Sequence, residues 1–194
     1  MIPPALLACA PNVARATLEA VISVESGGNP FAVHVNGLRQ RPPSPRDAKD
    51  AARIAEQYIA RGYSVDLGLM QVNSRHLAAL GVTIEQVLDP CTNIRSGATI
   101  LTADYAEAAR NRGEGQLALM AALSAYNTGD FYRGFVNGYV ARYYGPVVVP
   151  ALGVVVRETQ ATVPVPSRTV ASASSPYTAN TSVLAREPTN VRID

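Results

Sequence analysis

Metal-binding side chains are scarce in this sequence of 194 residues. It contains two cysteines, Cys9 and Cys91, and two histidines, His34 and His76, and their spacing matches no zinc or redox motif. We therefore expect no metal site and no cofactor, and we interpret both histidines as surface or hydrogen-bonded structural residues. The cysteines leave two alternatives open, a disulfide in an oxidising compartment or two unrelated buried thiols.

Charged residues are also few, at 16% of the chain, and no apolar run approaches the roughly twenty residues that a membrane span requires. The absence of such a run argues against a membrane-spanning protein. Lys/Arg clusters interleaved with aromatic residues are missing too, which argues against nucleic-acid binding. With 47% hydrophobic residues the chain can form one packed domain, and its net charge of +2 is compatible with an anionic polymer as ligand.

Hydrophobic periodicity predicts a mainly α-helical fold. A first helix is expected to start after Asn12 as its N-cap, because Leu18, Val21 and Ile22 follow at helical spacing. Glu25 shares their apolar face. The Gly27-Gly28 pair then ends the helix and leaves the Glu25 carboxyl beside a turn.

The remaining sequence alternates helical and irregular patterns. Residues 35–46, with the hairpin signal Asn36-Gly37, and residues 64–73 predict a small β or loop excursion. Further helices are expected over residues 47–61, after residue 73, and over 83–89, 94–110, 117–126 and 139–144. The helix over 117–126 is apolar nearly all round, which is typical of a central core helix.

The composition changes near residue 150 toward Val, Ser, Thr, Ala and Pro without a sustained period. We therefore expect a helical domain over residues 1–150 and a poorly ordered, largely disordered tail over residues 151–194. Residues 1–10 carry no basic segment and are short for a secretion signal, so the sequence shows no clear signal peptide and leaves the export route open.

Three short segments stand out by their order and spacing: Glu25–Pro30 (ESGGNP), Gly68–Asn73 (GLMQVN) and Ala125–Gly129 (AYNTG). Each alone is weak evidence. Together they resemble the motifs of the soluble lytic transglycosylase and goose-type lysozyme superfamily, over about residues 9–145. The resemblance implies a lysozyme-like helical domain that acts on peptidoglycan glycan strands.

Additional segments resemble one branch of this superfamily, which accompanies type IV secretion and conjugation systems. They are Cys9-Ala10-Pro11, Ser64-Val65-Asp66, Asn73-Ser74-Arg75 and Asp89-Pro90-Cys91. The resemblance implies a periplasmic enzyme that opens the cell wall locally so that such an apparatus can be assembled. It also favours a disulfide between Cys9 and Cys91, and it leaves the tail open as a segment that binds secretion-system components.

Glu25 is the candidate catalytic residue. Cleavage of a glycosidic bond needs a proton on the departing oxygen, and a carboxyl on an apolar helix face has its charged form disfavoured, which raises its pKa. Most glycosidases add a second carboxylate. Where a goose-type lysozyme would carry that acid, this sequence has Asn73. The resemblance thus favours a transglycosylase, in which Glu25 serves first as acid and then as base and leaves a 1,6-anhydromuramoyl end.

The resemblance also implies roles for neighbouring polar residues. Ser26 would orient the Glu25 carboxyl. The side chains of Gln71 and Asn73 would line the glycan cleft. Tyr126 would hydrogen-bond near the acid or the N-acetyl group, and Asn127 would hold the local turn. Simpler interpretations are a helix cap for Ser26, turn amides for the three amide side chains and a core aromatic for Tyr126.

Two other functions stay open. A goose-type hydrolase of the same fold would use water positioned by Asp66, which lies five residues before Gln71 and is a possible second carboxylate. Alternatively, the chain is an assembly module that holds glycan in its cleft and binds secretion components through its tail.

Overall fold

The computed structural model describes residues 2–144. The predicted domain boundary at residue 150 and the predicted tail over 151–194 lie outside the described residues. The described part is mainly helical, as predicted. Its helices are α1 (Pro4–Leu7), α2 (Arg15–Ser26), α3 (Ala48–Ile59), α4 (Leu77–Leu80), α5 (Ile84–Val87), α6 (Pro90–Arg112), α7 (Gln116–Thr128), α8 (Arg133–Val136) and α9 (Ala141–Tyr144), with a 3-10 turn η1 (Ser74–His76).

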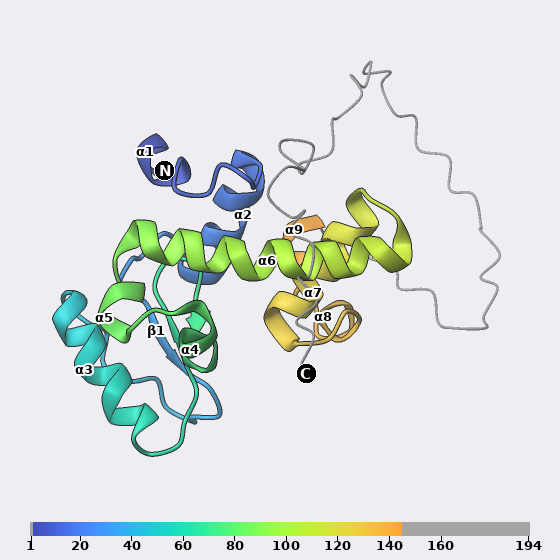
Figure 1. The fold of residues 1–194 in the computed structure, drawn as a ribbon. Coiled ribbons are helices and arrows are strands. Elements are labelled where there is room, and N and C mark those ends of the chain that lie inside the picture. Colours follow the sequence, from blue (N-terminus) through green and yellow to red (C-terminus); the bar gives the residue numbers. More distant parts are fainter. Residues whose placement is uncertain (1, 145–194) are drawn as a thin grey trace, which may run out of the picture.

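The long helix α6 crosses the middle of the molecule, and the other elements group around it (Figure 1). Helices α3 and α5 and the sheet lie near its first turns, whereas α7, α8 and α9 lie toward its other half. Helices α1 and α2 occupy a further side. Within residues 2–144, no helix combines the length and the apolar character that a membrane crossing requires.

Helix α2 carries the predicted apolar face, because Leu18, Val21 and Ile22 are all fully buried. The predicted N-cap was wrong. Residues 11–13 form turns that bury Val13, so the helix begins at Arg15 with Ala14 as the cap residue. At the other end the predicted stop is confirmed, since Gly27 adopts a left-handed conformation with φ 63° and caps the helix.

A small antiparallel sheet forms the predicted β excursion. Strands β1 (Val33–Val35), β2 (Val65–Leu67) and β3 (Val72–Asn73) pair in the order β1-β2-β3. The Asn36-Gly37 signal marks a turn but no tight hairpin, because β1 pairs with β2 across the whole of α3. The register places Asp66 of β2 opposite His34 on one side and Asn73 on the other.

Two packed clusters form the core. One cluster joins buried side chains of α1, α2, α6 and α7, and the other packs the sheet against α3, α4 and α5. The capping box of Thr83 and Gln86 is confirmed at α5. Asp89 follows α5 and is the N-cap of α6. Helix α6 therefore begins at Pro90, four residues before the predicted start at residue 94. A disulfide joins Cys9, just after α1, to Cys91 in the first turn of α6.

Candidate active site

The Glu25 carboxyl lies in the last turn of α2 and is mostly removed from solvent. Burial raises the pKa of Glu25, and the negative charge of Asp66 adds to that effect. A hydrogen bond from Tyr139 and the positive charge of Arg142 act in the opposite direction without cancelling it. The raised pKa predicted from the apolar helix face is therefore present, and it keeps this carboxyl protonated at a higher pH than an exposed Glu.

Tyr139, just before α9, is the direct partner of Glu25 and was not predicted as a site residue. Its hydroxyl donates a hydrogen bond to Glu25 Oε1 and lies 2.7 Å from the hydroxyl of Tyr143. Arg142 donates to the carbonyl of Val24 and lies 5.8 Å from the centre of the Tyr139 ring. The one signal in the sequence was the four-residue spacing of Tyr139 and Tyr143, which places them on one helical face.

Ser26 fastens the end of α2 to the Gly68–Asn73 segment. Its hydroxyl donates to the Leu69 carbonyl at 2.7 Å, with the Ile22 carbonyl at 3.1 Å, and accepts from the Gly28 N–H. The hydroxyl makes no hydrogen bond to Glu25 among the described residues. Any orienting effect on Glu25 therefore acts through the helix end that both residues share.

Within the Gly68–Asn73 segment, residues 68–71 form a tight turn that joins β2 to β3. Gly68 adopts φ 74° and packs so closely on Asn93 that an added Cβ would lie 2.7 Å from Asn93 Cγ. Asn93 is 1% exposed, donates to the carbonyls of Leu67 and Val87, and accepts from the N–H of Met70. Nothing in the sequence identified Asn93 as the residue that holds this turn.

Gln71 has a left-handed backbone with φ 49°, the one such non-glycine residue among those described. Its side-chain amide donates to the carbonyls of Ala32 at 3.2 Å and Gly68 at 3.0 Å. The side-chain nitrogen of Gln71 thus acts as a turn amide, as the simpler interpretation has it. The residue also lines the cleft. Strained backbone of this kind concentrates at functional sites.

Tyr126 lies in α7, behind the turn that carries Gln71. Its hydroxyl donates to the Met70 carbonyl at 2.6 Å, so its hydrogen bond goes to backbone rather than to the acid. Burial and the charge of Glu25 raise the pKa of Tyr126 well above its ordinary value. The hydroxyl therefore stays protonated and holds the turn in place.

Asp66 faces the cleft from the middle of β2. Asn36 donates to its Oδ2 at 2.8 Å and Asn73 donates to its Oδ1 at 2.5 Å. Burial raises the pKa of Asp66, while these two hydrogen bonds and the nearby His34 and His76 oppose the rise. The histidines have exposed side chains, in agreement with their predicted surface position.

A cleft of about 470 Å³ brings most of the predicted residues together. Its lining includes Glu25, Asp66, Gln71, Asn73, Tyr126 and Asn127. Ser26 is not part of this lining, and Asn127 accepts a hydrogen bond from Asn137 at 3.2 Å. Asp104 of α6 also lines the cleft and was not predicted.

Comparison with known proteins gives the family. The Transglycosylase SLT domain matches residues 5–143. The chain belongs to the transglycosylase SLT domain family. Protein virB1 of Agrobacterium fabrum is 42% identical over 134 residues, covering 69% of this chain and 54% of that protein.

Other curated relatives carry related names. Protein virB1 of Rhizobium radiobacter is 40% identical over 146 residues, 74% of this chain and 60% of the relative. Type IV secretion system protein virB1 of Brucella abortus biovar 1 is 42% identical over 139 residues, 70% of this chain and 58% of the relative. The chain thus spans less than two thirds of the length of these relatives. No solved structure matches it.

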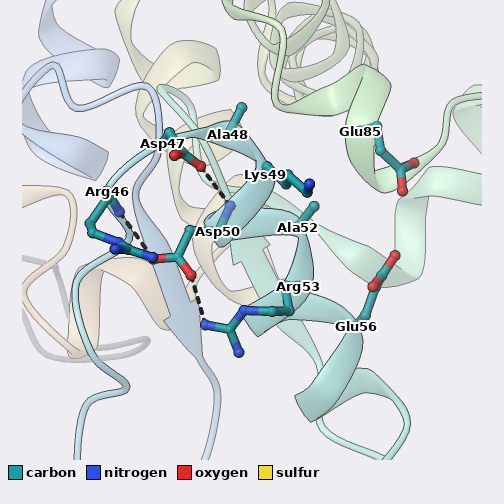
Figure 2. A pocket seen from close by; sticks show the side chains of 9 residues that line it. All are labelled: Arg46, Asp47, Ala48, Lys49, Asp50, Ala52, Arg53, Glu56 and Glu85. Atoms are coloured by element: carbon teal, nitrogen blue, oxygen red, sulfur yellow. Dashed lines mark hydrogen bonds and ion pairs between the residues drawn. The ribbon is translucent and has the colours of Figure 1, made fainter.

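A larger hollow of about 760 Å³ lies on the SLT domain away from this cleft, between α3 and α5. Figure 2 shows that charged side chains line it and that Asp50 pairs with Arg46 and Arg53. None of the predicted site residues lies there, and hydrogen bonds from Arg53 and Arg46 lower the pKa of its Asp50 carboxyl, which therefore stays ionised. Among residues 2–144, no group of three His, Cys, Asp or Glu side chains is arranged to hold a metal ion. The cleft with Glu25 is therefore the candidate active site.

Proposed function

We propose that this chain is a peptidoglycan lytic transglycosylase. It would cleave the β-1,4 bond between N-acetylmuramic acid and N-acetylglucosamine and leave a 1,6-anhydromuramoyl end. The observation that carries the proposal is the buried Glu25 carboxyl, whose pKa is raised and which lines the cleft of an SLT domain. A carboxyl whose raised pKa keeps its proton to a higher pH than an exposed Glu suits the general acid that the first step needs.

The reaction uses Glu25 twice. Protonated Glu25 gives its proton to the departing glycosidic oxygen, while the N-acetyl carbonyl of the muramic sugar stabilises C1. The Glu25 carboxylate then takes the proton from the O6 hydroxyl of the same sugar, and O6 bonds to C1, so no water is consumed. Between the two steps the hydrogen bond from Tyr139 stabilises the ionised carboxylate.

The polar residues of the cleft complete the proposal. Gln71, Asn73, Tyr126 and Asn127 would contact or shape the glycan, as their position in the lining supports. Ser26 would act as a positioning residue, since its hydrogen bond to Leu69 ties the helix end of Glu25 to the cleft wall.

A hydrolase that uses water is the second candidate, and one observation favours it. Asp66 lines the same cleft as Glu25 and is close enough to raise the pKa of Glu25. Both of its oxygens, however, already accept hydrogen bonds from Asn36 and Asn73. This arrangement suits an acid that shapes the cleft better than a free base for water.

Product analysis tests the proposal. Mass spectrometry of digested peptidoglycan should show anhydromuramoyl ends, which are lighter by one water than reducing ends. The Asp66→Asn variant should form the same product at a lower rate. Reducing ends in the wild-type digest, lost in Asp66→Asn, would establish the hydrolase instead.

We also propose that the enzyme works in the periplasm and opens the wall for a type IV secretion or conjugation apparatus. The Brucella relatives are named type IV secretion system protein virB1, which supports this context. In a host strain that lacks the gene, the wild-type chain should restore transfer or secretion and Glu25→Gln should not. Full restoration by Glu25→Gln would favour the assembly module, and truncation after residue 150 would test the tail as its binding segment.

A further inference from the structure

Asp104 occupies a position in α6 that faces the cleft. Gly97, Ile100 and Asp104 are spaced by three and four residues and therefore lie along one face of this helix. A Cβ added to Gly97 would lie 2.9 Å from the Tyr126 hydroxyl, so this face packs against that hydroxyl. Ile100 and Asp104 continue the same face into the cleft lining.

The Asp104 carboxyl is partly buried and has no partner within the described chain. No N–H or hydroxyl of residues 2–144 donates a hydrogen bond to it, and no cation there forms an ion pair with it. Burial raises the pKa of Asp104 to about 6, and the negative charge of Glu107 adds to the rise. Burying a carboxyl without a partner costs free energy, and nothing in the described fold offsets that cost.

Asp104 is also separated from the reacting acid. The pKa of Tyr126 responds to the charges of both Glu25 and Asp104, so both carboxyls lie within electrostatic reach of one ring. The two acids line one cleft from different helices, Glu25 from α2 and Asp104 from α6.

We propose that Asp104 is a substrate-binding residue whose carboxylate accepts hydrogen bonds from hydroxyl or N-acetyl N–H groups of a sugar beside the cleaved bond. The inference rests on the proposed function, because it takes a glycan strand as the ligand. A carboxylate suits this task, since hydrogen bonds to an ionised acceptor are stronger than neutral ones.

Peptidoglycan also offers a cationic donor, the ammonium group of a stem peptide. The charged groups of the lining are of both signs, Arg75 against Glu25 and Asp66, and so they do not select an ammonium. The apolar side chain of Ile100 and the ring of Tyr126 instead offer a surface for a sugar ring. These neighbours favour the sugar as the partner of Asp104.

Binding measurements in the Glu25→Gln background test the inference without turnover. The probes are soluble uncross-linked peptidoglycan strands, either intact or freed of stem peptides by an amidase. At pH 7.5, adding Asp104→Asn should weaken the binding of both probes about fivefold to tenfold, because a charged acceptor becomes a neutral amide. Adding Glu107→Gln instead, an exposed acid on the same helix, should change binding less than twofold.

A second measurement at pH 5 separates binding from a structural role. Below the pKa of about 6 the Asp104 carboxyl is protonated, so the difference between Asp104 and Asn should shrink toward zero. Other charged or titratable groups also face this region: Glu107 on α6, Tyr126 on α7, Asp66 on β2, and Arg75 and His76. These groups are common to both proteins, so their contribution cancels in the comparison.

Each outcome decides the inference. Equal binding by the Asp104 and Asn proteins at pH 7.5 would overturn it, and so would a loss confined to stem-bearing strands, which would assign Asp104 to the stem ammonium. If the Glu25→Gln protein with Asp104 intact binds neither probe, the proposed function fails and the inference with it. If the Glu25→Gln protein binds the probes and the added Asp104→Asn change has no effect, the inference fails and the proposed function stands.

Discussion

The Tyr139 hydroxyl donates a hydrogen bond to the Glu25 carboxyl across 114 residues of sequence. It is the one side-chain hydrogen bond that Glu25 receives from the described residues. Tyr139 is itself 4% exposed, and its pKa is raised by burial and by the charge of Glu25, so it stays a donor at any pH at which the enzyme would work. The protonation of Glu25 therefore depends on this tyrosine.

Removing that donor should change both rate and pH profile. In Tyr139→Phe, the ionised form of Glu25 loses a hydrogen bond, so its pKa rises further and the alkaline limb of the rate profile moves to higher pH. The rate should fall about tenfold, which corresponds to the loss of one hydrogen bond to a charged group. Turnover of purified peptidoglycan between pH 5 and 9 would measure both effects.

Tyr143→Phe is the matched control, because it removes a hydroxyl from the same cluster but leaves the bond between Tyr139 and Glu25 in place. It should shift the limb in the same direction by a smaller amount. An unchanged profile in Tyr139→Phe would contradict the role assigned to Tyr139.

Glu25→Gln should abolish turnover and also stabilise the fold at neutral pH. General acid and base catalysis contribute factors of about 10² to 10⁴, so activity should fall at least a hundredfold. The folded-state pKa of Glu25 is raised, so the wild type loses stability as pH rises from below the ordinary value of 4.5 to above the raised one. Above that window Glu25→Gln should unfold at a higher denaturant concentration than the wild type, and below it the two should coincide. A lower midpoint in the variant at pH 7 would contradict the burial argument.

The turn that carries Gln71 should depend on the absence of a side chain at Gly68. Gly68→Ala has to adopt a positive φ and also push against Asn93, whereas Gly37→Ala meets the same backbone cost at φ 79° with open space around it. The control should lose about 1 kcal/mol of unfolding free energy. Gly68→Ala should lose about 1–3 kcal/mol more, as in overpacked cores. Equal losses in urea unfolding would show that the Asn93 contact relaxes freely.

The disulfide should contribute a large part of the unfolding free energy of the domain. Cys9 and Cys91 are 82 residues apart, and a closed loop of that length corresponds to about 4–5 kcal/mol in the chain-entropy description. Unfolding midpoints with and without a reducing agent measure this contribution. The double variant Cys9→Ala/Cys91→Ala should match the reduced wild type and should not respond to the reducing agent. A wild-type midpoint that the reducing agent leaves unchanged would contradict the prediction.

Much of the fold followed from local patterns. Asp47 caps α3 where the amphipathic pattern begins, Thr83 and Gln86 form their capping box, and α7 buries most of its side chains as its apolar pattern predicts. These features depend on residues within a few positions of each other. Helix α8 was not predicted, because its four residues are too few to show a period.

The predicted site residues also lie together, with Ser26 at the margin and the rest in one cleft. The partners that set their chemistry were not predictable in the same way. Tyr139 reaches Glu25, and Asn93 reaches the turn at Met70, only because tertiary packing brings distant segments together. Asp104 lay within a predicted helix, but its cleft-facing direction depends on how α6 packs against α7.

The long separation between Glu25 and Tyr139 has a consequence for synthesis. Chains are made from the N-terminus, so the acid is present well before its partner. A chain that ends before residue 139, whether nascent or cut by a protease, contains all three motif segments and still lacks the hydroxyl that holds the acid. For a protein whose substrate would be the wall of its own cell, the last part of the domain to be made is then the part that completes the cutting site.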